Sequence, residues 1–214
     1  MKVIDLTHTI AEDMPVYPGE EGPKLQPLKS YEPDGLKVTL ITMCSHTGTH
    51  IDSPAHLFPY RTSLDQFPVA HFIGKALVID CSDLNEGERI TFERIKRCKE
   101  KADRAEFILF RVGWDKYWGT EKYFENYPCI DDTVIDYLIQ SQKKGVGFDT
   151  TSIDPVSDES LTNHRKLLSN TDILIIENLT NLKQAGDDLF LFCIFPLKHV
   201  QADASPVRAI ALLD

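Results

Sequence analysis

Positive charge, long apolar runs and paired cysteines are all scarce in this chain of 214 residues. The net charge of −10 argues against nucleic-acid binding, which favours basic patches, and disfavours contact with anionic membranes. No stretch is long and apolar enough to span a bilayer, and the first residues lack the apolar run and cleavage site of a signal peptide. The five cysteines include no Cys-x-x-Cys pair, which suits reduced thiols. We therefore expect a cytoplasmic protein without nucleic-acid or membrane partners.

Apolar segments of strand length alternate with amphipathic segments of helix length. This alternation predicts an α/β fold with a mixed sheet, and the length suits one domain over residues 1–214. Residues 7–31 contain four prolines and are predicted to be mostly loop. The expected strands are 3–6, 36–43, 76–81, 107–112, 145–148, 172–176, 189–196 and 207–213, and the expected helices are 91–101, 131–142 and a short one from 163.

The most informative stretch is residues 45–56, which hold three of the seven histidines and an aspartate. In an extended segment His46, His50 and Asp52 share one face, and all three are ligand types for zinc and related divalent metals. A straight strand would hold the two histidines roughly 13 Å apart, which is near the limit for reaching one ion. We therefore expect a bend at Gly48, because glycine tolerates unusual dihedrals.

The pattern His46-x-Gly48-Thr49-His50-x-Asp52-x-Pro54-x-His56 resembles the signature of the cyclase-family metal hydrolases, which include bacterial kynurenine formamidases and isatin hydrolases. Residues 113–119 resemble the family's loop beside the active site, and residues 149–155 resemble its Gly-Ile-Asp-x-x-Ser-x-Asp-Pro run. The resemblance spans nearly the whole chain and implies the swivelling β/β/α architecture.

Two aspartates in that second run, Asp149 and Asp154, could be ligands. We assign them structural roles instead, because aspartate side chains readily stabilise turns.

The resemblance also implies the rest of a metal site. In the family a histidine and, a dozen or so residues later, a glutamate supply the remaining ligands, and His164 and Glu177 match that pattern. The implied site is binuclear: His46, His50, Asp52 and Glu177 would hold one ion, and Asp52, His164 and Glu177 the second. Both carboxylates would bridge, since each has two oxygens. Zinc is the expected metal, and manganese also fits these ligands.

The implied reaction is hydrolysis of a small-molecule amide by metal-activated water. His56, just past the ligands, would move protons and end as acid to the leaving nitrogen. Tyr17 stands where kynurenine formamidases have a substrate-contacting tryptophan, and we expect it to contact substrate, in its own subunit or across a homodimer interface. The aromatic residues of 113–129 would ordinarily indicate packing, and the family resemblance implies instead that they form a wall of the substrate pocket.

Two substrates and two classes of function remain open. The primary expectation is an arylformamidase-like enzyme that converts N-formylkynurenine to kynurenine and formate, and the nearest alternative is a hydrolase of a cyclic amide such as isatin. The other class is a metal-binding protein without turnover. His56 separates the two classes, because a purely structural site needs no extra base beside its ligands. The family implies a homodimer or homotetramer.

Overall fold

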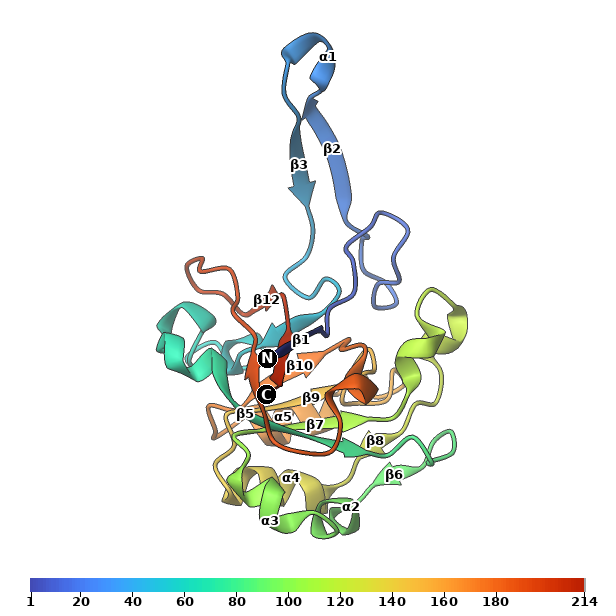
Figure 1. Ribbon diagram of the computed structural model, residues 1–214, viewed down its shortest axis with the longest axis vertical. Coiled ribbons are helices and arrows are strands. Elements are labelled where there is room, and N and C mark those ends of the chain that lie inside the picture. The colour runs from blue at the N-terminus through green and yellow to red at the C-terminus, as the bar shows by residue number, and fades with distance from the viewer. Residues whose placement is uncertain (214) are drawn as a thin grey trace.

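The computed structural model describes residues 1–213, and a nine-stranded mixed sheet lies at its centre (Figure 1). The strand order is β1-β13-β11-β5-β7-β9-β10-β4-β12. No helix in the described residues is both long and apolar enough to cross a membrane. The strands of this sheet are β1 (Lys2–Asp5), β4 (His50–Asp52), β5 (Ile73–Asp80), β7 (Phe107–Arg111), β9 (Gly145–Phe148), β10 (Leu174–Glu177), β11 (Phe190–Cys193), β12 (Ala204–Pro206) and β13 (Ile210–Leu213).

Strands β5, β7, β9 and β10 run parallel in the middle of the sheet, and antiparallel strands flank them on both sides. Helices pack on one face, below the sheet in Figure 1. The predicted α/β fold with a mixed sheet is therefore confirmed. The helices are α2 (Phe92–Lys96), α3 (Lys99–Arg104), α4 (Asp132–Gln140) and α5 (Thr162–Leu168).

Alternation along the central strands divides the core in two. In β7, Ile108 and Phe110 face the helices, whereas Phe107 and Leu109 face the other side of the sheet. That second core joins side chains of the central strands β5, β7 and β10 to side chains of the outer strands β1, β4, β11 and β13, and to residues of loops and 3₁₀ turns, among them η6 (Leu182–Ala185). The sheet therefore curls around its own second face instead of burying it under a further helical layer.

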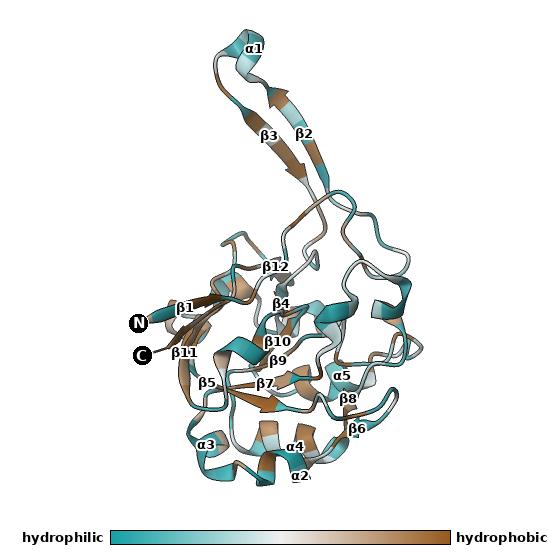
Figure 2. Cartoon of the chain, turned by 45° about the vertical axis from the view of Figure 1, so that its right-hand side comes forward, coloured by the Kyte–Doolittle hydropathy of each residue, from teal (hydrophilic) through white to brown (hydrophobic). Residues whose placement is uncertain are grey.

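The prediction that residues 7–31 are mostly loop is wrong at its C-terminal end. Strand β2 (Lys24–Lys29) pairs antiparallel with β3 (Val38–Thr42), and the short helix α1 (Tyr31–Asp34) lies at the tip. This hairpin projects from the body (Figures 1 and 2). Pro27 is tolerated because a two-stranded ribbon consists only of edges, and the register shifts between Pro27 and Lys29.

The helix predicted over residues 91–101 is in fact two helices, α2 and α3. Cys98, between them, adopts non-helical dihedrals (φ −130°, ψ 29°). The break at Cys98 changes the direction of the chain, so that Ile95 of α2 and Ala102 of α3 both lie in the same core. A further pair of short strands, β6 (Arg89–Ile90) and β8 (Cys129–Ile130), closes this end of the molecule. The remaining predicted strands are present with ends shifted by a few residues, whereas β12 was not predicted.

Candidate metal centre

Pairing between β4 and β10 places three of the predicted ligands on one face of the sheet. His50 lies directly opposite Glu177 in the antiparallel register, and Asp52 lies opposite Ile175. Residues paired in this way project from the same face, with Cβ atoms about 5 Å apart. Ile51, between the two β4 ligands, points into the opposite core and is fully buried. Because side chains alternate along a strand, His50 and Asp52 point to the face opposite Ile51, which is the helix-covered side.

The predicted bend at Gly48 is present. Gly48 has φ +65°, and a Cβ atom there would lie 3.2 Å from Met14 Cε. The turn returns the chain so that His46 lies beside the end of β4, with its ring centroid 5.2 Å from that of His50. The Gly48 carbonyl accepts two hydrogen bonds, from His50 Nδ1 (2.8 Å) and from Asn178 Nδ2 (2.9 Å). Asn178, which the sequence analysis did not single out, thus ties the turn to the end of β10.

Helix α5 delivers His164 over the strand ends, and Asp154 holds it there. Asp154 accepts hydrogen bonds from the backbone N–H groups of Asn163 (2.7 Å) and His164 (3.1 Å), and its Oδ2 also accepts from His164 Nδ1 (2.7 Å). Asp149 accepts from the backbone N–H groups of Val112 (2.8 Å) and Gly113 (2.7 Å). Both aspartates therefore have the structural roles that we assigned to them, and Asp154 in addition orients an imidazole.

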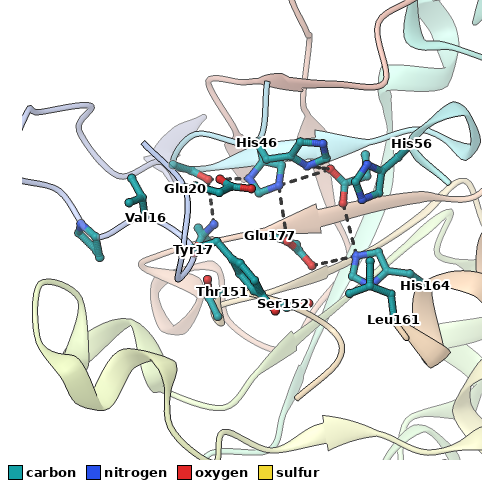
Figure 3. A pocket seen from close by; sticks show the side chains of 15 residues that line it. Val16, Tyr17, Glu20, His46, His56, Thr151, Ser152, Leu161, His164 and Glu177 are labelled. Carbon is teal, nitrogen blue, oxygen red and sulfur yellow. Dashed lines mark hydrogen bonds and ion pairs between the residues drawn. The ribbon is translucent and has the colours of Figure 1, made fainter. Parts of the chain in front are cut away.

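Asp52 and Glu177 lie at the middle of the site, and each places one carboxylate oxygen near His50 and the other near His164. Asp52 Oδ1 lies 3.3 Å from His50 Nε2, while Asp52 Oδ2 lies 3.5 Å from His164 Nε2. Glu177 does the same: Oε2 lies 3.5 Å from His50 Nε2, and Oε1 lies 3.3 Å from His164 Nε2. His46 Nδ1 lies 2.9 Å from Asp52 Oδ1. The structure thus brings all five predicted ligands together. Figure 3 labels His46, His164 and Glu177 among them.

These side chains fit divalent metal. Ligands about 2 Å from a tetrahedral ion lie about 3.3 Å from one another, which matches the separations above. His50 Nε2 and both oxygens of Asp52 are buried without a hydrogen-bond partner within the described residues, so each has a free site for a cation. Burial works to lower the pKa of His46, but Asp52 and Asp203 outweigh it and raise this pKa to about 10. The carboxylates therefore favour positive charge at the centre, and divalent cations supply it.

His56 lies on the 3₁₀ turn η1 (Pro54–His56), which begins where Pro54 ends the strand segment, as predicted. Its ring centroid is 4.2 Å from that of His46 and 6.1 Å from that of His164. One nitrogen of His56 is close enough to His46 and Asp52 for all three to share an ion. Burial lowers the pKa of His56. The geometry therefore suits both a proton-transferring group and a further ligand.

A cavity of about 140 Å³ opens over the centre. Residues of the N-terminal loop, including Tyr17, line one side of it, and Leu161 lines another. No lysine or arginine lines it. Figure 3 labels ten of the lining residues, which are Val16, Tyr17, Glu20, His46, His56, Thr151, Ser152, Leu161, His164 and Glu177.

Of the two interpretations of the aromatic residues of 113–129, packing is confirmed and the pocket wall is wrong. None of them lines the cavity, and Trp114, Tyr123 and Tyr127 are buried in the core. Tyr123 donates its hydroxyl to Asn178 Oδ1 (2.8 Å), and the Tyr127 hydroxyl donates to the Asp154 carbonyl. This segment therefore packs in the core, where its large rings are removed from water, and its two hydroxyl groups bind Asn178 and Asp154 next to the centre.

Comparisons of sequence and structure relate this chain to known proteins. Residues 4–155 match the family model described as "Putative cyclase". An uncharacterised protein of Methanocaldococcus jannaschii is 36% identical over the full length of both chains. A kynurenine formamidase of Bordetella avium is 31% identical, covering 96% of this chain and 95% of its own. Isatin hydrolase A of Labrenzia aggregata superposes with a TM-score of 0.85 at 26% identity, covering 98% of this chain and 93% of its own. The chain belongs to the cyclase family of proteins.

Proposed function

We propose that this protein is a metal-dependent hydrolase that cleaves a carbon–nitrogen bond of a small amide, with N-formylkynurenine or a related aryl-formamide as substrate. The observation that carries the proposal is the shared geometry of Asp52 and Glu177, each of which turns one oxygen to His50 and the other to His164. Two carboxylates arranged in this way suit two adjacent cations that they bridge. Zinc is the expected metal, and manganese fits the same ligands.

In this proposal His46, His50, Asp52 and Glu177 hold one ion, and Asp52, Glu177 and His164 hold the other. Bound there, the ions would polarise the substrate carbonyl and lower the pKa of a water molecule. Water oxygen joins the amide carbon, the carbon–nitrogen bond breaks, and the nitrogen leaves with a proton. His56 is the group positioned to deliver that proton, because its ring lies beside His46 and His164 at the cavity.

Glu20 favours a formamide with an amino-acid side chain over isatin. Glu20 lines the cavity, and no lysine or arginine is among the described residues that line it. An ammonium group, such as the α-amino group of N-formylkynurenine, would pair with Glu20, whereas isatin has no such group. Isatin remains the second candidate because of the similarity to isatin hydrolase A.

Turnover of N-formylkynurenine, formyl-anilides, isatin and other cyclic amides by metal-reconstituted protein tests the proposal. We expect formamide cleavage that a chelator abolishes and added metal restores, with up to two ions per chain by elemental analysis. Full activity in a metal-free preparation would exclude the metal mechanism. Bound metal without turnover of any of these amides would favour the alternative, a metal-binding protein that is not an enzyme.

We also propose that the hairpin β2–β3 packs against a second copy of this chain. An isolated two-stranded hairpin is marginally stable in water. Leu40 (42% exposed) and Ile41 (53%) are neighbours in β3, so both faces of the hairpin present apolar groups. Residues 24–42 also carry three lysines against two acidic residues, whereas the whole chain has a net charge of −10. An apolar, slightly basic arm suits the acidic body of another copy.

Light scattering after size-exclusion chromatography tests this pairing. We expect a dimer for the wild type and a monomer when Leu40 and Ile41 are both replaced by serine. Val69→Ser, an exposed apolar residue on the body (71% exposed), is the matched control and should stay dimeric. A monomeric wild type would overturn the proposal.

A further inference from the structure

A further carboxylate, that of Asp203, lies beside the centre and outside the proposed set of metal ligands. Asp203 lies immediately before β12, and its Oδ2 lies 3.1 Å from His46 Nε2. The other ring nitrogen of His46, Nδ1, faces Asp52 Oδ1 at 2.9 Å. The His46 ring is therefore held between two carboxylates, one at the centre and one outside it. Since a carboxylate accepts, His46 can donate from Nε2 to Asp203 while Nδ1 faces the centre, so Nδ1 is the nitrogen that would lose its proton to bind a metal ion.

The backbone of Asp203 is fixed independently of its side chain. Its carbonyl accepts hydrogen bonds from Ser53 N (2.8 Å) and Ser53 Oγ (2.9 Å). The next residue, Ala204, pairs with Asp52 across the β4–β12 ladder. The strand that carries two of the metal ligands thus also sets the position of this carboxylate, and replacing the carboxylate leaves these contacts in place.

The ring orientation of His46 depends more on a contact of this kind than the ring orientations of His50 and His164 do. His50 lies within β4, and its Nδ1 donates to the Gly48 carbonyl (2.8 Å). His164 lies within α5, and its Nδ1 donates to Asp154 (2.7 Å). His46 lies outside any helix or strand, before the turn at Gly48, so the backbone alone does not set its ring orientation.

We infer that Asp203 is a positioning residue that holds the His46 imidazole with Nδ1 directed at the metal centre. The inference rests on the proposed metal centre. A carboxylate that accepts from a ligating histidine fixes the tautomer and the ring orientation, and its loss typically weakens metal binding 10–100-fold. That loss should fall on the ion that His46 binds, and the ion beside His164 should be retained with nearly wild-type affinity.

Zinc titration of chelator-treated protein against a chromophoric competitor tests the inference. We expect Asp203→Ala to weaken one binding step about 10–100-fold and to leave the other nearly unchanged. Ser45→Ala is the control, because it removes only the hydrogen bond from Ser45 Oγ to Asp203 Oδ2 (3.2 Å). It should bind zinc as the wild type does.

A double-mutant cycle with His46→Ala separates positioning from a general effect on folding. If Asp203 acts through His46, Asp203→Ala should change zinc affinity little in the His46→Ala background. An equal loss in both backgrounds, or unchanged affinity for both ions in Asp203→Ala, would overturn the inference. A wild type that binds no zinc would instead overturn the proposed metal centre, so the two failures are distinguishable.

Discussion

Replacing Glu177 by glutamine should separate metal binding from folding, because unfolding with zinc and unfolding with chelator measure the two effects independently. Glutamine has nearly the same shape and keeps one oxygen, which can still accept the hydrogen bond that Glu177 Oε1 receives from Ile153 N (3.1 Å). It removes the negative charge and one of the two oxygens that face His50 and His164. Both ions of the proposed centre therefore lose a ligand or its charge.

The expected size of the effect follows from linkage. An ion at a free concentration 100 times its dissociation constant stabilises the folded chain by about 2.7 kcal/mol, so two independent ions contribute about 5.4 kcal/mol. If Glu177→Gln weakens each ion about 100-fold, the same zinc concentration equals the new dissociation constant, and the two contribute about 0.8 kcal/mol together. The metal-dependent stabilisation should fall by about 4.6 kcal/mol. In chelator the variant should be less stable than the wild type, because His50 and His164 lose a buried carboxylate that faces them, and the chelator samples measure this loss separately from the metal effect.

Urea unfolding of both proteins, with zinc and with chelator, measures these four values, and elemental analysis gives the metal content of the same samples. Glu125→Gln, which removes an exposed carboxylate, is the matched control and should behave as the wild type. Retention of both ions and of the full zinc-dependent stabilisation in Glu177→Gln would refute the bridging role. A large loss of stability in chelator would show instead that Glu177 is needed for folding.

Three further predictions concern groups around the centre. His56→Ala should lower kcat roughly 10²–10⁴-fold while retaining its metals, and loss of metal measured on the same sample would make His56 a ligand instead. Tyr17→Ala should mainly raise KM, because it removes part of the cavity wall and no reacting group, and unchanged kinetics with the true substrate would argue against contact. Burial lowers the pKa of His8 to about 4, against an opposing effect of Asp115, while its ring stacks on Trp118. A histidine whose pKa is lowered by folding stabilises the folded state above its unfolded pKa of about 6.5, and this stabilisation is lost as pH falls toward 4. The free energy of unfolding in urea should therefore fall between pH 7 and pH 5 by up to about 2 kcal/mol more in the wild type than in His8→Phe, and by less to the extent that water reaches the ring. An equal pH dependence in the two proteins would contradict this prediction.

The spacing of residues within the motif of residues 46–56 was enough to predict which side chains share one face. Alternation put His50 and Asp52 on one face, and the need for His46 to return toward them predicted the bend at Gly48, which the structure has at φ +65°. These inferences succeed because each depends on dihedrals and periodicity within a few residues. Glu177 was identified differently, from the resemblance to the family, in which a glutamate follows a histidine by a dozen or so residues.

Failures occurred where a distant contact decided the local structure. Strand β2 forms despite Pro27 because its partner β3 supplies the pairing. Cys98 ends one helix and precedes another because both helices must reach the same core. Asp203 could not be found from sequence, since the contact that gives it a role joins residues 157 positions apart. Single-sequence patterns contain little information on such pairs.

The supports of the three histidines differ in the same way. Gly48 and Asp154 lie close in sequence to the imidazoles that they orient, at separations of two and ten residues. Asp203 reaches His46 only after β12 has paired with β4, so this part of the centre cannot form before the C-terminal strands join the sheet. Assembly of the His46 side of the centre therefore depends on the whole sheet. The His164 side takes its imidazole from α5, where Asp154 orients it, and shares Asp52 and Glu177 with the other ion. Only the first ion of the proposed centre includes His46, and this is the physical reason for expecting the two ions to respond separately to Asp203→Ala.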